Sequence, residues 1–166
     1  SEEELNVRME LEHGTRLSTL EVNAELAGID LSNTKLENHA RTVIRSKTML
    51  EIINTALARL ISAEARGEPY SGQVAVGAVV LNRIKHPSFP NTLSGVIYQS
   101  GAFTCISDGQ FNQPVAESAY RAARDALNGV DPSGGAIYYF NPSTATSSWI
   151  WSRPLITVIG KHRFCS

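Results

Sequence analysis

Residues 71–86, SGQVAVGAVVLNRIKH, constrain the fold more than any other stretch of this chain. The run is apolar on nearly every side of a helix, so it predicts a helix that neighbours cover all round. Small residues at Ala75, Gly77 and Ala78 would let those neighbours pack closely. With 166 residues available, the sequence predicts one main domain built around this central helix.

A second helix is predicted just before it. Thr48 and Glu51 have the spacing of a capping box, and an apolar stripe of helical period follows at Ile53, Leu57, Leu60 and Ile61. We expect this helix over about 49–66, ending at Gly67 with Pro69 just beyond.

The second half of the chain changes character along its length. We expect a short helix over 92–99, loop or short extended pieces over 100–114, and a helix from Pro114 to Gly129. From residue 134 onward β-branched and aromatic residues alternate with glycine and proline, which favours short strands or extended loops. The predicted fold class is α+β, helix-dominated with a small β element.

The first 48 residues differ in composition from the rest. Acidic residues concentrate there, and proline and aromatic residues are absent. Residues 5–22 fit a hairpin, a helix over 17–27 fits equally well, and Ser32 can cap a further helix. We therefore separate a polar N-terminal arm, 1–48, of uncertain structure, from a domain over 49–166.

Composition excludes several classes of function. A net charge of -1 and a pI near 6.4 leave no field strong enough to recruit nucleic acid or an anionic membrane. No apolar run is long enough to cross a membrane, and the start lacks the pattern of a signal peptide, although a removed leader would look the same. Cys105 and Cys165 have no metal-ligand spacing, so we expect no metal and either two buried thiols or one disulfide.

Glu64 is the first candidate for chemistry. It follows Leu60 by four residues and Ile61 by three, so it continues the apolar face of its helix toward the core. Partial shielding from water favours the protonated form that a general acid needs. The alternative is that Glu64 pairs with Arg66, Arg59 or Arg83 and tethers the helix end.

Glu68 lies beyond the helix break at Gly67. On pattern alone it is a loop carboxylate near the start of the next helix. Two histidines, His86 and His162, sit in no nucleophile pattern, and we interpret both as structural. The stretches GAFT and DGQF offer polar groups, including Asp108, that could line a groove.

Residues 138–151, YYFNPSTATSSWIW, concentrate aromatic and hydroxyl side chains around Asn141. Aromatic faces stack on sugar rings while amides and hydroxyls meet the ring hydroxyls. A small aromatic core explains the composition equally well, and alternation allows only part of the set to face one side.

Over residues 53–166 the chain resembles the bacterial cell-wall hydrolase family of spore-cortex-lytic enzymes. The resemblance rests on the ordered motifs EARGEP, GQVAV, VLNR, HPSFP, GAF and YFNP, and on the ending IGKHRFC. It implies a lysozyme-like domain that cleaves the N-acetylmuramic acid to N-acetylglucosamine bond of peptidoglycan as a lytic transglycosylase, without cofactor. The protein would then be exported to the cell wall or spore cortex, with glycan strands as its partner and its oligomeric state unknown.

The resemblance also implies roles for individual residues. Glu64 matches the catalytic glutamate, which overturns the tethering alternative. Substrate contacts are assigned to Glu68, Gln73, Phe103, Tyr139, Asn141, Trp149 and Trp151. Two alternatives stay open: a hydrolytic muramidase, with Glu68 or Asp108 holding the attacking water, and a non-catalytic module that binds peptidoglycan.

Overall fold

The structure, a computed structural model, describes residues 38–166, with side chains from residue 49 onward apart from those of Thr104 and Ser107. The expected hairpin or helix in the arm and the cap at Ser32 lie outside these residues. The chain divides into two compact units, Ser1–Ile53 and Asn54–Ser166. The second unit contains the whole candidate site.

Helix α3 spans Asn38–Glu64 without interruption. The expected new helix start at residue 49 is therefore wrong, because no glycine or proline between 38 and 64 stops the preceding turns from continuing. Its C-terminal end follows the prediction closely. Leu57, Leu60 and Ile61 are fully buried, and Gly67 takes a left-handed φ of 77° that turns the chain away.

Helix α4, Tyr70–Lys85, is the predicted central helix, and eleven of its residues are buried. Gly77 explains how closely its neighbours approach. A Cβ at Gly77 would lie 2.9 Å from the Cδ1 of Ile61 and 3.2 Å from the Cβ of Ala126. The absence of a side chain therefore lets α4 pack directly against α3 and against α7, Glu117–Leu127.

The connection between α4 and α7 is more helical than expected. Helix α5, Leu93–Ile97, is capped by Thr92, whose Oγ1 accepts from the amide of Gly95. Helix α6, Thr104–Asp108, and the 3-10 helix η1, Gln110–Asn112, occupy the stretch expected to be loop or extended. The left-handed Gly109 ends one and begins the other, so one turn residue separates two helices too short to show a period.

Helix α7 begins at Glu117, and the expected start at Pro114 is wrong. Ala116 has an extended backbone, φ -65° and ψ 141°, and its amide donates to the hydroxyl of Ser62 at 3.0 Å. This tertiary hydrogen bond keeps Ala116 extended, so the helix begins three positions after the proline.

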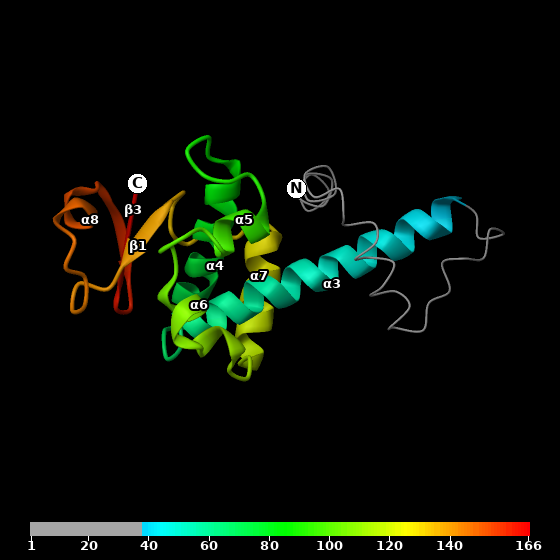
Figure 1. Cartoon of the computed structure of the whole chain (residues 1–166), viewed down its shortest axis with the longest axis horizontal. Helices are drawn as coiled ribbons and strands as arrows, with labels where there is room; N and C mark the ends of the chain where they lie inside the picture. The colour runs from blue at the N-terminus through cyan, green and yellow to red at the C-terminus, as the bar shows by residue number, and fades with distance from the viewer. Residues whose placement is uncertain (1–37) are drawn as a thin grey trace. The chain divides into compact units, whose positions relative to one another are not determined.

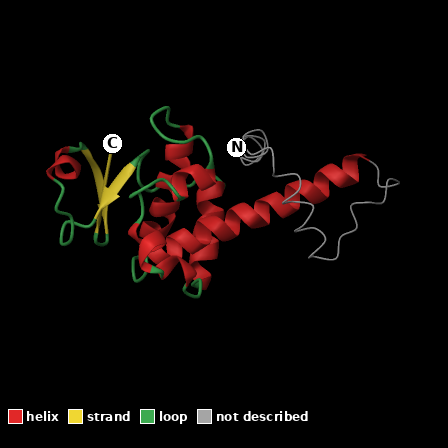
Figure 2. Cartoon of the chain, in the orientation of Figure 1, coloured by secondary structure: helices red, strands yellow, loops and turns green. Residues whose placement is uncertain are grey.

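Three short antiparallel strands form one sheet in the order β1-β3-β2: β1 Tyr138–Phe140, β2 Leu155–Ile159 and β3 His162–Cys165. Figure 2 shows the strands together on one side of helices α4–α7, with the short helix α8, Ser148–Ser152, beyond them. Figure 1 shows α8 on the far side of the sheet from α4 and α6. The α+β class, helix-dominated with a small β element, is confirmed.

Candidate active site

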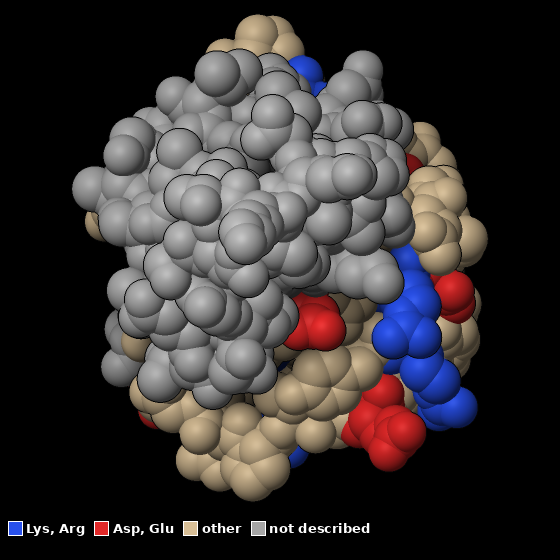
Figure 3. Space-filling view, turned by 90° about the vertical axis from the view of Figure 1, so that its right-hand side faces the viewer, with Lys and Arg blue, Asp and Glu red and all other residues tan. Residues whose placement is uncertain are grey.

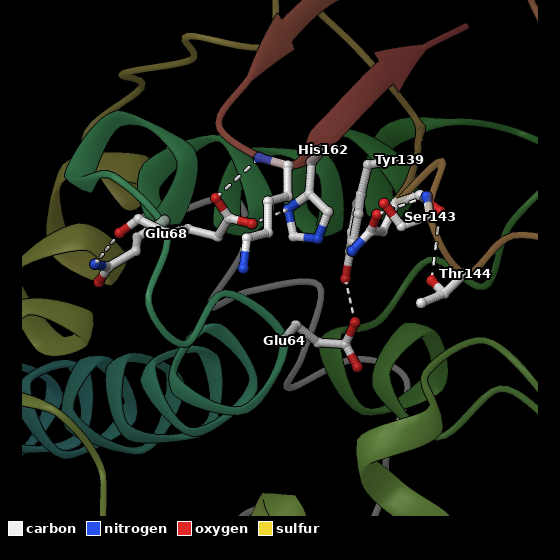
Figure 4. Close-up of polar contacts among 9 residues, drawn as sticks. Glu64, Glu68, Tyr139, Ser143, Thr144 and His162 are labelled. Atoms are coloured by element: carbon white, nitrogen blue, oxygen red, sulfur yellow. Dashed lines mark hydrogen bonds and ion pairs between the residues drawn. The ribbon is translucent and has the colours of Figure 1, made fainter.

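Glu64 is the last residue of α3, and its side chain is half-buried where the sheet meets the helices. The hydroxyl of Tyr139, from the middle of β1, donates a hydrogen bond of 2.6 Å to Oε2 of Glu64 (Figure 4). The apolar periodicity of α3 and the alternation of β1 thus bring one carboxyl and one phenol together. The two residues that the sequence assigned to acid chemistry and to substrate are direct partners.

Tyr139 can act on Glu64 only as a neutral donor. Withdrawal of its hydroxyl from water, the negative charge of Glu64 and their hydrogen bond raise the pKa of Tyr139 well above its ordinary value. Across β3, Tyr139 is the register partner of Phe164, and its ring lies 5.8 Å from the ring of Phe164. The phenol is therefore held from one side of its ring.

Arg83, on α4, is the buried cation of this region, with 7% of its surface exposed. Its Nε donates to the carbonyl of Ile137 at 2.7 Å, and its guanidinium lies over the rings of Phe89, Phe103 and Tyr138 at 5.1, 5.2 and 5.7 Å. Burial lowers the pKa of Arg83, while the nearby Tyr139, Tyr138 and Glu64 raise it. Arg83 thus places a positive charge beside the Glu64 carboxylate.

Cys105, on α6, is the second buried group beside Glu64. Burial raises the pKa of the Cys105 thiol to about 12, and the charge of Glu64 and a hydrogen bond to its carboxylate add to this effect. Cys105 and Cys165 are both free and buried, so they are two buried thiols and not a disulfide. Both thiols stay protonated near neutral pH, since burial also raises the pKa of Cys165.

Glu68 faces the turn between β2 and β3. Its Oε2 accepts from the amide of Lys161 at 3.1 Å, and its Oε1 lies 3.8 Å from Nδ1 of His162 (Figure 4). A Cβ on Gly160 would clash with the Glu68 carboxylate, so this approach requires glycine there. Glu68 therefore joins the break after α3 to the β2–β3 turn.

Three other residues with predicted substrate contacts are held by the fold. Gln73 donates from Nε2 to the carbonyl of Glu68 at 3.1 Å and accepts at Oε1 from Ser118 at 2.9 Å. Phe103 is buried under Arg83. Asn141 accepts at Oδ1 from the amide of Ser143 at 2.9 Å and so shapes the turn after β1.

The two tryptophans lie on the other face of the sheet from Tyr139. Trp149 stacks edge-on against Tyr138 at 5.1 Å, and Trp151 against Phe140 at 5.0 Å. Tyr138 and Phe140 alternate with Tyr139 along β1, and successive strand residues point to opposite faces. The aromatic set of residues 138–151 is thus divided, and Trp149 and Trp151 keep 52% and 49% of their surfaces exposed.

Three residues of the site were not assigned to it by the sequence: Arg83, Cys105 and His162. Arg83 carries a signal that could have been used, because it follows the buried Val79 and Val80 by four and three residues, as Glu64 follows Leu60 and Ile61. His162 shares a face of β3 with Phe164, but only the strand register shows that this face meets Tyr139. Nothing in the sequence around Cys105 distinguishes it.

We searched the described residues for a metal site and for a helix that could cross a membrane. Among those residues, no group of three or more His, Cys, Asp or Glu side chains converges as metal ligands would. No helix in that part is both long enough and apolar enough to cross a bilayer. On the face shown in Figure 3, acidic side chains lie beside the basic ones, so the described charges there are mixed.

The chain is similar in sequence and in structure to known proteins of one family. Residues 67–165, more than half of the chain, match the family model described as Cell Wall Hydrolase, and the match begins just after Glu64. The spore cortex-lytic enzyme of Halalkalibacterium halodurans is 62% identical over 110 residues, which are 66% of this chain and 33% of that protein. The chain thus spans about a third of that relative's length.

Two solved structures share the fold. The catalytic domain of the Bacillus cereus SleB protein is 55% identical with a TM-score of 0.66, over 70% of this chain and 91% of that one. The catalytic domain of the germination-specific lytic transglycosylase SleB from Bacillus anthracis is 57% identical with a TM-score of 0.65, over 68% and 93%. The chain belongs to the cell wall hydrolase family.

Proposed function

We propose that this protein cleaves the glycan strands of peptidoglycan at the N-acetylmuramic acid to N-acetylglucosamine bond as a lytic transglycosylase, with Glu64 as its single acid and base. The observation that carries the proposal is the hydrogen bond from Tyr139 to Glu64, which holds one carboxyl at the edge of a buried helix face. Its solved relative from Bacillus anthracis is described as a lytic transglycosylase, which supports the reaction type.

The reaction needs one proton shuttle. Protonated Glu64 gives its proton to the glycosidic oxygen as the bond from that oxygen to the anomeric carbon breaks. The Glu64 carboxylate then removes the proton of the sugar's C6 hydroxyl, whose oxygen attacks the anomeric carbon and closes a 1,6-anhydro ring. The enzyme ends protonated as it began, and no water is consumed.

Tyr139 and Arg83 both stabilise the ionised form of Glu64 that exists between the two proton transfers. After the first proton transfer Glu64 is an anion, and the neutral Tyr139 hydroxyl stabilises it by donating to Oε2. The positive charge of buried Arg83 favours the same state. Both groups are fixed by the fold before substrate arrives, so little reorganisation accompanies the charge change.

The alternative, a hydrolytic muramidase, ordinarily needs a second carboxylate to activate water or to attack the sugar. The two candidates from the sequence are both engaged. Glu68 accepts from Lys161 and faces His162, and the Asp108 oxygens accept from the amide and the side chain of Gln110 at 3.0 and 3.2 Å. These contacts favour the mechanism with one carboxyl.

The substrate class and location are part of the proposal. The relatives named spore cortex-lytic enzymes suggest cortex peptidoglycan, and therefore an exported protein. Tyr139, Asn141, Gln73 and Phe103 are proposed substrate contacts, and of these Tyr139 hydrogen-bonds Glu64 directly. Glu68, Trp149 and Trp151 stay predicted substrate contacts. Glu68 also accepts from Lys161, and the tryptophans pack on Tyr138 and Phe140.

Replacing Glu64 with glutamine tests the proposal, since it preserves shape and removes the acid. We expect release of soluble muropeptides from purified peptidoglycan to be abolished. The matched control is Glu117→Gln, an exposed glutamate in the first turn of α7. Parent-like release by Glu64→Gln would refute the role of Glu64, and binding of the parent chain without any release would favour the non-catalytic module.

A further inference from the structure

Glu68 and Glu64 are connected through two side chains of the sheet. Glu68 faces His162 of β3, the ring of His162 lies 4.9 Å from the ring of Tyr139 of β1, and the hydroxyl of Tyr139 donates to Glu64. Glu68 lies in the break after α3, and Glu64 is the last residue of α3. His162 belongs to β3 and Tyr139 to β1. In Figure 4, Glu68, His162 and Tyr139 follow one another across the view, and Glu64 lies below the Tyr139 hydroxyl. We call these four connected residues the positioning row.

His162 is placed by burial rather than by hydrogen bonds. Only 7% of its surface is exposed, and within the described part of the chain its Nδ1 has no hydrogen-bond partner. Oε1 of Glu68 lies 3.8 Å from that nitrogen, and both side chains of this pair keep less than a tenth of their surface exposed. A buried ring nitrogen beside a buried carboxylate orients the ring electrostatically, because the local dielectric is low.

The ring of His162 has a definite task in that orientation. It packs against Tyr139 at an interplanar angle of 57°, and Phe164 packs against Tyr139 at 40°. Two neighbouring rings of β3 thus fix the plane of the phenol and with it the direction of the hydroxyl. A displacement of about 1 Å at a catalytic group can lower a rate by about a hundredfold.

We infer that the Glu68–His162 pair positions Tyr139, and through Tyr139 the carboxyl of Glu64, which makes both members positioning residues for the proposed reaction. This inference rests on the proposed role of Glu64. It gives Glu68 a task other than the substrate contact assigned to it by the sequence, and it gives His162 a task beyond general packing.

The charges around His162 fit a neutral ring. Burial lowers the pKa of His162, while the carboxylates of Glu68 and Glu64 raise it. The titratable groups that face it are Glu68 from the break after α3, Glu64 from α3 and Tyr139 from β1. An uncharged ring at neutral pH leaves the balance of charge at Glu64 to Arg83.

A chain of positioning contacts predicts losses that do not multiply. We expect Glu68→Gln, His162→Ala and Tyr139→Phe each to lower kcat, by about tenfold or more for the latter two, with KM within about twofold. Combined variants should be no worse than the most severe single one. His86→Ala is the matched control, a histidine that packs on Phe89 outside this row.

Two kinetic outcomes would overturn the inference: losses that multiply when His162→Ala is combined with Tyr139→Phe, or a raised KM with unchanged kcat for Glu68→Gln. A second measurement stands apart from turnover. In the full chain with isotope-labelled tyrosine, the Tyr139 ring signal, assigned by its loss in Tyr139→Phe, should shift with the titration of His162 and lose that shift in His162→Ala.

The nuclear magnetic resonance result separates the two ways to fail. If the parent chain releases no muropeptides, the proposed function fails, while a Tyr139 signal that follows His162 still supports the positioning row. A Tyr139 signal that is the same in His162→Ala and in the parent contradicts the row, whatever the activity.

Discussion

Tyr139 donates a 2.6 Å hydrogen bond to Glu64 from 75 positions further along the chain. The bond joins the end of α3, the longest of the described helices, to the middle of a three-residue strand. Because the phenol is a donor only in its neutral form, the raised pKa of Tyr139 keeps this contact intact throughout the physiological pH range. The candidate site therefore depends on correct docking of the sheet against the helices.

Removing this hydroxyl should slow the reaction, because the hydroxyl donates to Glu64, while the ring that remains keeps its proposed contact with substrate. A hydrogen bond to a charged group is worth about 1.5–3 kcal/mol, so we expect Tyr139→Phe to lower kcat by about 10- to 100-fold. Steady-state release of muropeptides measures the effect. Tyr120→Phe, at an exposed tyrosine of α7, is the control, and equal rates for both variants would exclude Tyr139 from the chemistry.

His162 should make stability depend on pH in a defined direction. Its folded pKa lies below the ordinary value of 6.5, so between the two values the unfolded chain binds more protons. The contribution is present above about pH 6.5 and is lost as the pH falls through the folded pKa.

The comparison of the parent with His162→Phe isolates this effect. The difference in free energy of unfolding, parent minus variant, should shrink between about pH 8 and about pH 5. Denaturant titrations at each pH give the difference. A difference that grows toward acid pH would mean that the fold favours the charged ring.

Gly160 should be intolerant of a side chain for two reasons. Its φ of 56° is left-handed, and an added Cβ would clash with the Glu68 carboxylate. Gly101 has a φ of 71° with nothing within 4 Å of an added Cβ, so Gly101→Ala measures the backbone strain alone, about 1–3 kcal/mol. We expect Gly160→Ala to lose more stability than Gly101→Ala in chemical denaturation. Equal losses would show that the Glu68 side chain moves aside at no cost in stability.

Gly77 should be equally sensitive, for packing reasons. An added methyl would press on Ile61 and Ala126, and overpacking of a tight core costs about 1–3 kcal/mol. Gly72, in the first turns of the same helix, would meet only ordinary contacts at 3.4 Å and beyond. Thermal unfolding should therefore show a loss for Gly77→Ala and little change for Gly72→Ala, and the reverse order would contradict the packing described here.

The sequence predicted what local periodicity controls. The burial of α4, the direction of Glu64 and the left-handed stop at Gly67 each follow from residues within one or two turns. The resemblance to the cell wall hydrolase family, carried by residues 53–166, is also confirmed. Which residues of the site act in the reaction stays a prediction.

Contacts between distant segments were outside the reach of such patterns. The partnership of Tyr139 with His162 depends on the register of β1 against β3, and a shift of one residue would turn Tyr139 to the opposite face. The division of the aromatic stretch follows from the same register. Helices α6 and η1 were missed because each is too short to show a period.

The mass of the reaction products tests the central claim most directly. Purified peptidoglycan digested by the parent chain should yield muropeptides with 1,6-anhydro ends, one water lighter than hydrolysed ends, and Glu64→Gln should yield neither. Anhydro ends that depend on Glu64 are the result this account predicts. Hydrated reducing ends from the parent chain would contradict it and assign the attacking oxygen to water.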